Sequence, residues 1–152
     1  MALRSIRTEE DPILRKQSRL VEKFDERLQI LIDDMLETMY DAEGVGLAAV
    51  QIGVLKQVIV IDTGEPGEKL VLINPEIIDR KGLQKTPEGC LSLPGKCGIV
   101  ERPLEVTVRA LDRNGREYTK TGRNLLAKAF CHEIDHLSGV LFTDKMIEAV
   151  QN

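Results

Sequence analysis

The sequence predicts an α+β protein in which largely antiparallel sheets pack around one central helix that carries an HExxH motif. Three observations lead to this prediction. Apolar residues recur at spacings of three and four between Leu28 and Tyr40, which is typical of an amphipathic helix, and a second helix is expected near the end of the chain. Short apolar or alternating runs, typical of strands, lie between them without a regular strand–helix–strand alternation. The chain has 152 residues, so we expect a single domain spanning residues 1–152.

Composition narrows the class of protein. The chain is 42% hydrophobic and 30% charged, with a net charge of −4, as expected of a globular protein without broad affinity for nucleic acid or anionic lipid. No apolar run approaches the ~18 residues of a membrane span, and no export or transit signal is visible. The three cysteines are an odd number, which favours a thiolate ligand or buried thiols over disulfides. We therefore expect a cytoplasmic protein with no membrane attachment and no direct nucleic-acid specificity.

The first predicted helix begins after Asp25, a plausible N-cap, and stops near Gly44. Its apolar residues recur on one face, which we expect to be buried: Leu28, Leu31, Ile32, Met35, Leu36, Met39 and Tyr40.

Four segments are predicted to be strands. Residues 58–61 and 70–73 are short apolar runs, and Asn74-Pro75 is expected to end the second. Residues 104–111 alternate between apolar and polar side chains, as a half-buried strand does. A turn at 112–115 then allows residues 116–121 to return antiparallel.

The last predicted helix runs from about Asn124 to Ser138, with Gly139 as the residue after its cap, and contains His132-Glu-Ile-Asp-His136. Four residues advance a helix by about 6 Å and leave the two imidazoles about 40° apart in direction, so both can reach one cation. Glu133 lies close to this face without being a ligand. These are the only two histidines of the chain, which favours a metal site over an accidental pairing.

A catalytic divalent metal takes three protein ligands and keeps one open position. Phe142 stands where extended zinc peptidase motifs have a third histidine, and Glu148 is near the end of the chain. Cys90, expected in a constrained loop between Gly89 and Pro94, is the strongest remaining soft ligand. Cys97 and Cys131 are interpreted as buried thiols, Cys131 pointing away from the metal.

Two alternatives remain open at this point. The first is a small peptidase that cuts internal peptide bonds, although it lacks a downstream ligand. The second is a closed structural metal site made by Cys90, Cys97, His132 and His136, on which folding would depend.

Three segments taken together resemble the peptide deformylase family. They are Gly44-Val-Gly46-Leu-Ala-Ala-Val-Gln51, Glu88-Gly-Cys90-Leu-Ser92 and His132-Glu-Ile-Asp-His136-Leu, and the likeness extends from Asp11 to Gly139. The resemblance implies a metal-dependent hydrolase that removes the N-terminal formyl group from formyl-methionyl nascent polypeptides and releases formate. It also implies an α+β fold around the HExxH helix and transient contact with the ribosome.

The resemblance assigns roles to individual residues. Cys90, His132 and His136 would hold one divalent metal ion, natively Fe(II), for which Zn(II) or Ni(II) can substitute. Glu133 would move the proton between water and the departing amine. The side-chain amide of Gln51 and the backbone N–H of Leu91 would stabilise the oxyanion.

The resemblance also implies a pocket for the methionine side chain, made by Val45, Gly89, Leu125, Ala129 and the edge of His132. Gly46 would let the substrate backbone approach closely. Without the resemblance, Gln51 reads as a plain polar residue and Gly44 as a helix stop.

Some positions are open or depart from the family. Arg102 reads equally as a surface residue or as the partner of Glu88 in a buried ion pair. Cys131 replaces the common glutamine before the HExDHL motif, for which we expect a local packing difference. The segment after Asp144 is too short for a long C-terminal helix.

Overall fold

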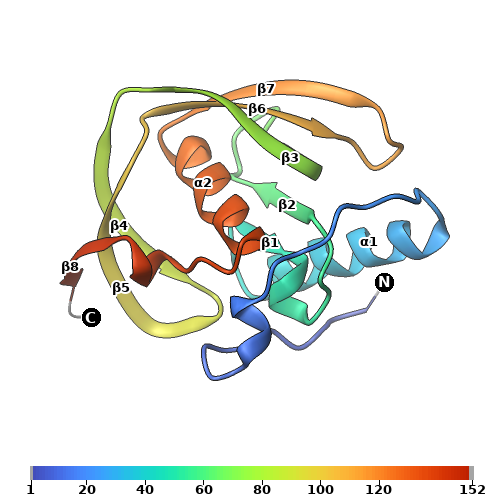
Figure 1. Ribbon diagram of the computed structural model, residues 1–152, viewed down its shortest axis with the longest axis horizontal. Coiled ribbons are helices and arrows are strands. Elements are labelled where there is room, and N and C mark those ends of the chain that lie inside the picture. Colours follow the sequence, from blue (N-terminus) through green and yellow to red (C-terminus); the bar gives the residue numbers. More distant parts are fainter. Residues whose placement is uncertain (1, 151–152) are drawn as a thin grey trace.

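Two antiparallel sheets enclose a central helix in the computed structural model, which describes residues 2–150 (Figure 1). One sheet has five strands in the order β1-β2-β3-β6-β7, and the other has three in the order β4-β5-β8. Helix α2 contacts strands of both sheets. This confirms the predicted α+β class. The elements are η1 (Pro12–Arg15), α1 (Glu26–Asp41), β1 (Gly46–Ala48), η2 (Ala49–Ile52), β2 (Val58–Asp62), β3 (Lys69–Lys81), β4 (Gln84–Cys90), β5 (Leu93–Arg102), β6 (Glu105–Leu111), β7 (Glu117–Arg123), α2 (Leu125–Leu137), η3 (Phe142–Asp144) and β8 (Met146–Val150).

Helix α1 begins where the sequence predicts. The Asp25 carboxylate accepts a hydrogen bond of 3.0 Å from the N–H of Leu28, which satisfies one free donor of the first turn. Most of the predicted apolar face is buried, but Tyr40 is wrongly placed on it. Its side chain is 46% exposed, and its hydroxyl donates to Asp62 at 2.6 Å.

The end of α1 differs from the prediction at Gly44. The left-handed residue is Glu43, with φ of 56°, and the N–H of Gly44 donates to the carbonyl of Met39 at 2.9 Å. This is the Schellman arrangement shifted by one residue. The absence of a side chain at Gly44 also makes room for Leu91, because a Cβ on Gly44 would lie 2.7 Å from Leu91 Cδ1.

Strand β3 is longer than predicted, because Asn74-Pro75 does not end it. The pairing of β3 with β6 is irregular between Ile73 and Glu76, and the strand then continues to Lys81. Asn74 has φ of 51°, and its side-chain amide exchanges two hydrogen bonds with the backbone of Val21. These bonds hold the irregular residue in place. The predicted hairpin that follows, from β6 through residues 112–115 to β7, is confirmed.

The three-stranded sheet was not predicted from the sequence. In β4 only Glu88 is buried, so the strand has no apolar pattern by which it could be recognised. Strand β8 occupies the segment after Asp144, so the structure has no long C-terminal helix in the described residues.

Helix α2 forms the centre of the core. In Figure 1 it runs through the middle of the molecule, below β6 and β7. Its buried Leu126, Ala127 and Phe130 belong to a cluster with residues of β2, β3 and β6. Cys131 is 6% exposed and belongs to the same cluster, which confirms that it is a buried thiol. None of the described helices is long and apolar enough to span a membrane.

Candidate active site

The two histidines of α2 lie one helical turn apart on one buried face. His136 is 1% exposed and His132 is 9% exposed, and their ring centroids are 5.0 Å apart. The helix end is defined by Gly139, whose φ of 74° follows the cap as predicted. A Cβ on Gly139 would lie 2.4 Å from the carbonyl oxygen of Arg15, so η1 packs directly against this end of α2.

Cys90 reaches the histidines from the other sheet. It is the last residue of β4, paired with Leu93 across the tight β4–β5 turn, and not part of a loop as expected. Its Sγ lies 3.5 Å from Nε2 of His136. One donor atom from each of Cys90, His132 and His136 lies within 4.8 Å of the others. A thiolate and two imidazoles so placed fit one first-row divalent cation.

Cys97 does not belong to this donor cluster, which among the described residues consists of three members. It lies in β5 opposite Val150 of β8 and is half-buried, so the prediction of a buried thiol is wrong for Cys97. The closed four-ligand structural site is therefore contradicted.

A buried network of charged side chains contacts the Nδ1 side of the His132 ring. Its Nδ1 lies 3.0 Å from Oε1 of Glu88, and Arg102 binds both oxygens of Glu88 at 2.8 and 3.0 Å. Arg102 also donates to Asp135 at 2.7 Å and is 2% exposed, so it is the buried partner and not a surface residue. Burial alone would raise the pKa of Glu88, but the hydrogen bonds from His132 and Arg102 lower it to about 2. With Glu88 ionised, its carboxylate is placed to accept a proton from Nδ1 of His132, which would leave the Nε2 lone pair for a metal ligand bond.

Glu133 presents a buried carboxylate beside the donor cluster. It is 5% exposed, and its Oε1 has no hydrogen-bond partner among the described residues. Burial raises the pKa of Glu133 to about 7. A Cβ on Gly46 would lie 2.7 Å from Oε2 of Glu133, so the glycine makes room for this carboxylate. This contact of Gly46 was not predicted, since Gly46 was expected only to let the substrate backbone approach.

Gln51 lies in η2 and is 1% exposed, so it is not a plain polar residue at the start of a strand. Its Oε1 accepts a hydrogen bond from the N–H of Ala48 at 3.0 Å. Its Nε2 donates to Ser92 Oγ at 3.0 Å and lies 3.6 Å from Cys90 Sγ. Ser92, to which the sequence analysis gave no role, thus fixes the amide at the edge of the donor cluster.

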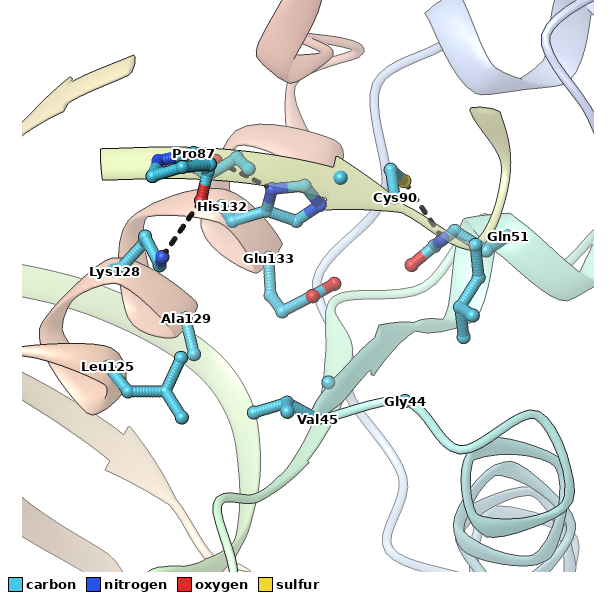
Figure 2. Close-up of a pocket in the computed structure, with 14 residues that line it drawn as sticks. Gly44, Val45, Gln51, Pro87, Cys90, Leu125, Lys128, Ala129, His132 and Glu133 are labelled. Carbon is cyan, nitrogen blue, oxygen red and sulfur yellow. Dashed lines mark hydrogen bonds and ion pairs between the residues drawn. The ribbon is translucent and has the colours of Figure 1, made fainter. Parts of the chain in front are cut away.

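A hollow of about 260 Å³ opens beside these groups (Figure 2). It brings together the predicted site residues, except that His136 does not line it. Four further residues, Gly44, Pro87, Glu88 and Lys128, were not predicted to line it. Lys128 follows Leu125 by three positions, so the two residues share a face of α2. Helical periodicity could therefore have predicted that Lys128 lines the hollow. The lining consists of Gly44, Val45, Gly46, Gln51, Pro87, Glu88, Gly89, Cys90, Leu91, Leu125, Lys128, Ala129, His132 and Glu133.

One thiolate and two imidazoles, which would leave one position open on a cation, with a carboxylate alongside, define the site of a metal-dependent hydrolase. The family model of polypeptide deformylase matches residues 3–152. A peptide deformylase of Alkaliphilus metalliredigens is 62% identical, with 97% of this chain and 99% of the relative covered. The crystal structure of a peptide deformylase from Legionella pneumophila superposes with a TM-score of 0.92 at 51% identity, covering 95% of this chain and 86% of that one. That from Thermotoga maritima superposes with a TM-score of 0.91 at 39% identity, covering 96% and 99%.

The chain therefore belongs to the polypeptide deformylase family, and its activity is the removal of the N-formyl group from nascent polypeptides. This confirms the family, the reaction and the hydrolase class that the three motifs predicted. A peptidase that cuts internal peptide bonds receives no support.

Proposed function

We propose that Cys90, His132 and His136 hold a single Fe(II) ion, for which Zn(II) or Ni(II) can substitute. The mutual approach of their donor atoms to within 4.8 Å is the observation that carries this proposal. The donor set suits several first-row cations, so the preference for iron rests on the family resemblance. When bound, the cation polarises the formyl oxygen and lowers the pKa of water towards neutrality.

Glu133 is the proton carrier of the reaction. It accepts the proton of the attacking water and passes it to the amine nitrogen as the C–N bond breaks. The proposal is supported by the position of its carboxylate, which is buried, lines the hollow and has one oxygen without a partner.

Gln51 and Leu91 supply hydrogen-bond donors for the developing oxyanion. The Nε2 of Gln51 lies at the edge of the donor cluster, 3.6 Å from the Cys90 sulfur, and Ser92 holds it there. Leu91 directly follows Cys90 in the tight turn and lines the hollow, which supports its backbone N–H as the second donor. Loss of one such donor typically costs about 10²–10³ in rate.

The hollow receives the methionine side chain, bounded by Val45, Gly89, Leu125, Ala129 and His132. The substrate backbone lies in extended form along Gly46 of β1, opposite the end of β4. A misfit of one methylene in such a pocket costs only ~1–3 kcal/mol, so other unbranched residues are tolerated.

Residues 1–152 act as one cytoplasmic catalytic domain that meets nascent chains as they leave the ribosome. Sharing of α2 between the two sheets supports the single domain. The net charge of −4 gives the proposed transient ribosome contact no independent support.

Formate release from a formyl-Met peptide by metal-replete protein tests the proposed site when wild type is compared with Glu133→Ala. We expect the variant to keep its metal and its fold and to lose turnover. Anaerobic purification followed by metal analysis tests the iron assignment, and highest activity with zinc, indifferent to air, would contradict it.

A further inference from the structure

Among the residues that line the hollow assigned to the methionine side chain, one is a lysine, Lys128 of α2. The residue is half-buried, and its Nζ donates to the carbonyl of Pro87 at 3.1 Å and to Thr86 Oγ1 at 3.2 Å. Figure 2 shows the ammonium reaching from α2 across to β4, on the side of the hollow away from Cys90. Lys128 therefore closes that side with a cation in place of an apolar side chain.

The ammonium has a donor to spare. A lysine has three N–H donors, and the two bonds to β4 are the hydrogen bonds of Nζ among the residues that the structure describes. No carboxylate of the described part pairs with it within 4.0 Å, and Glu88, which also lines the hollow, is already engaged by Arg102 and His132. One N–H is thus free for a ligand.

The position of Lys128 matches the reach of a methionine. Lys128 precedes His132 by four residues, which is about 6 Å along the helix axis. Five bonds separate the formyl carbon from the methionine sulfur, roughly 6 Å in an extended chain. A side chain that enters from the donor cluster along α2 therefore brings its sulfur to the level of the Lys128 Cα along the helix, and Lys128 lines the hollow there.

We propose that Lys128 lets the hollow accept an oxidised formyl-methionine, whose sulfoxide oxygen takes a hydrogen bond from the Lys128 ammonium. The inference rests on the proposed placement of the methionine side chain. A sulfoxide in a wholly apolar pocket would lose its water without a partner and be excluded. Here the cation supplies the partner, so the substrate class extends to nascent chains whose first residue has been oxidised. The hydrolysed formamide bond is the same as in the unoxidised substrate.

The test compares kcat/KM for formyl-methionine sulfoxide and formyl-norleucine peptides of the same sequence. Norleucine has the length of methionine and no acceptor, so the ratio of the two values reports the sulfoxide contact and cancels general damage to a variant. We expect wild type to process the sulfoxide within about tenfold of norleucine, with one sulfoxide epimer preferred. In Lys128→Met the ratio falls about tenfold, because a hydrogen bond to a charged group is lost.

Two further variants keep the test specific. Lys128→Arg retains a donor and is expected to retain most of the ratio. Lys85→Met removes a lysine from the same strand as Thr86, but Lys85 is 63% exposed and pairs with Glu101 away from the hollow, so the ratio stays unchanged. A ratio that is equal in wild type and Lys128→Met, or a wild type that rejects the sulfoxide by more than about 10²-fold, overturns the inference.

The failure of this inference and that of the proposed function are distinguishable. Absence of formate release from an unoxidised formyl-Met peptide contradicts the proposed function. Normal release from that peptide together with an unchanged ratio contradicts only the role of Lys128. Ala129→Phe, which fills the hollow, is expected to lower kcat/KM for all three peptides, and no effect would overturn the pocket and the inference together.

Discussion

The carboxylate of Glu133 occupies the space that a side chain on Gly46 would need. The Cβ of an alanine at position 46 would lie 2.7 Å from Glu133 Oε2 and 3.0 Å from its Cγ. One strand residue thereby determines how far a helix residue can extend towards the donor cluster. The position of the proposed proton carrier thus depends on contact between β1 and α2.

Gly46→Ala is expected to lower kcat by about 10–100-fold while the metal content is retained, because Glu133 must turn away. A double-mutant cycle with Glu133→Ala measures the coupling. In the Glu133→Ala background the alanine at position 46 should cost little further activity. Additive losses in the cycle would show that Gly46 acts on the substrate alone.

Arg102→Met is expected to weaken metal binding about 10–100-fold, because Glu88 loses its ion pair and no longer holds His132. It should also lower the free energy of unfolding by about 3–5 kcal/mol, since a buried carboxylate is left without its partner. Competition with a chelator and chemical denaturation measure the two effects. The matched control is Arg109→Met, whose exposed pair with Glu76 is worth less than about 1 kcal/mol. Equal effects of the two substitutions would contradict the supporting role of the network.

Ser92→Ala is expected to lower kcat about tenfold with a smaller change in KM, because Gln51 loses the acceptor that fixes its amide. The expected loss is smaller than that of Gln51→Ala, in which the donor itself is removed. Ser18→Ala is the control, since Ser18 is also buried but its Oγ has no hydrogen-bond partner in the described residues. If both serine variants turn over like wild type, Ser92 does not position Gln51.

Asp34 is expected to make stability depend on pH at the acid end. Burial alone would raise the pKa of Asp34, but the hydrogen bonds from Arg4 and from the N–H of Ala2 hold it below its ordinary value of 3.8. A lowered folded-state pKa contributes stability above the unfolded pKa, and this contribution is lost as the pH falls through the folded value. Asp34→Asn should therefore cost about 1–2 kcal/mol at neutral pH.

The difference in unfolding free energy between wild type and Asp34→Asn should shrink below about pH 4, near the unfolded pKa of aspartate. Denaturation curves at several pH values measure it. Asp33→Asn, which removes a half-exposed partner of Arg113, is the matched control and should have a smaller effect. A difference that stays constant down to pH 2 would contradict the linkage.

Local signals in the sequence were sufficient for α1, β6, β7 and α2, because caps, periodicity and turn residues lie within a few positions of one another. The same holds for the spacing of His132 and His136. The passage of β3 through Asn74 could not be predicted in this way. It depends on hydrogen bonds with Val21, which is distant in the chain.

In the site, too, the residues could be predicted from the sequence but the contacts between distant segments could not. The resemblance supplied its residues, but the motifs do not contain the contacts between them. The fit of Gly46 against Glu133 and the reach of Lys128 to Pro87 arise only when α2 packs between β1 and β4. Strand β4 has one buried residue and no apolar pattern, so its pairing with β5 had no sequence signal, and only the predicted ligand Cys90 indicated its approach to α2.

The most direct test of the central claim measures metal stoichiometry and formate release in Cys90→Ala and Cys97→Ala side by side. Both remove one half-buried thiol, but only Cys90 belongs to the donor cluster. We predict one equivalent of metal and full turnover of a formyl-Met peptide for Cys97→Ala, and loss of both for Cys90→Ala. Metal retention with normal formate release in Cys90→Ala would contradict the account.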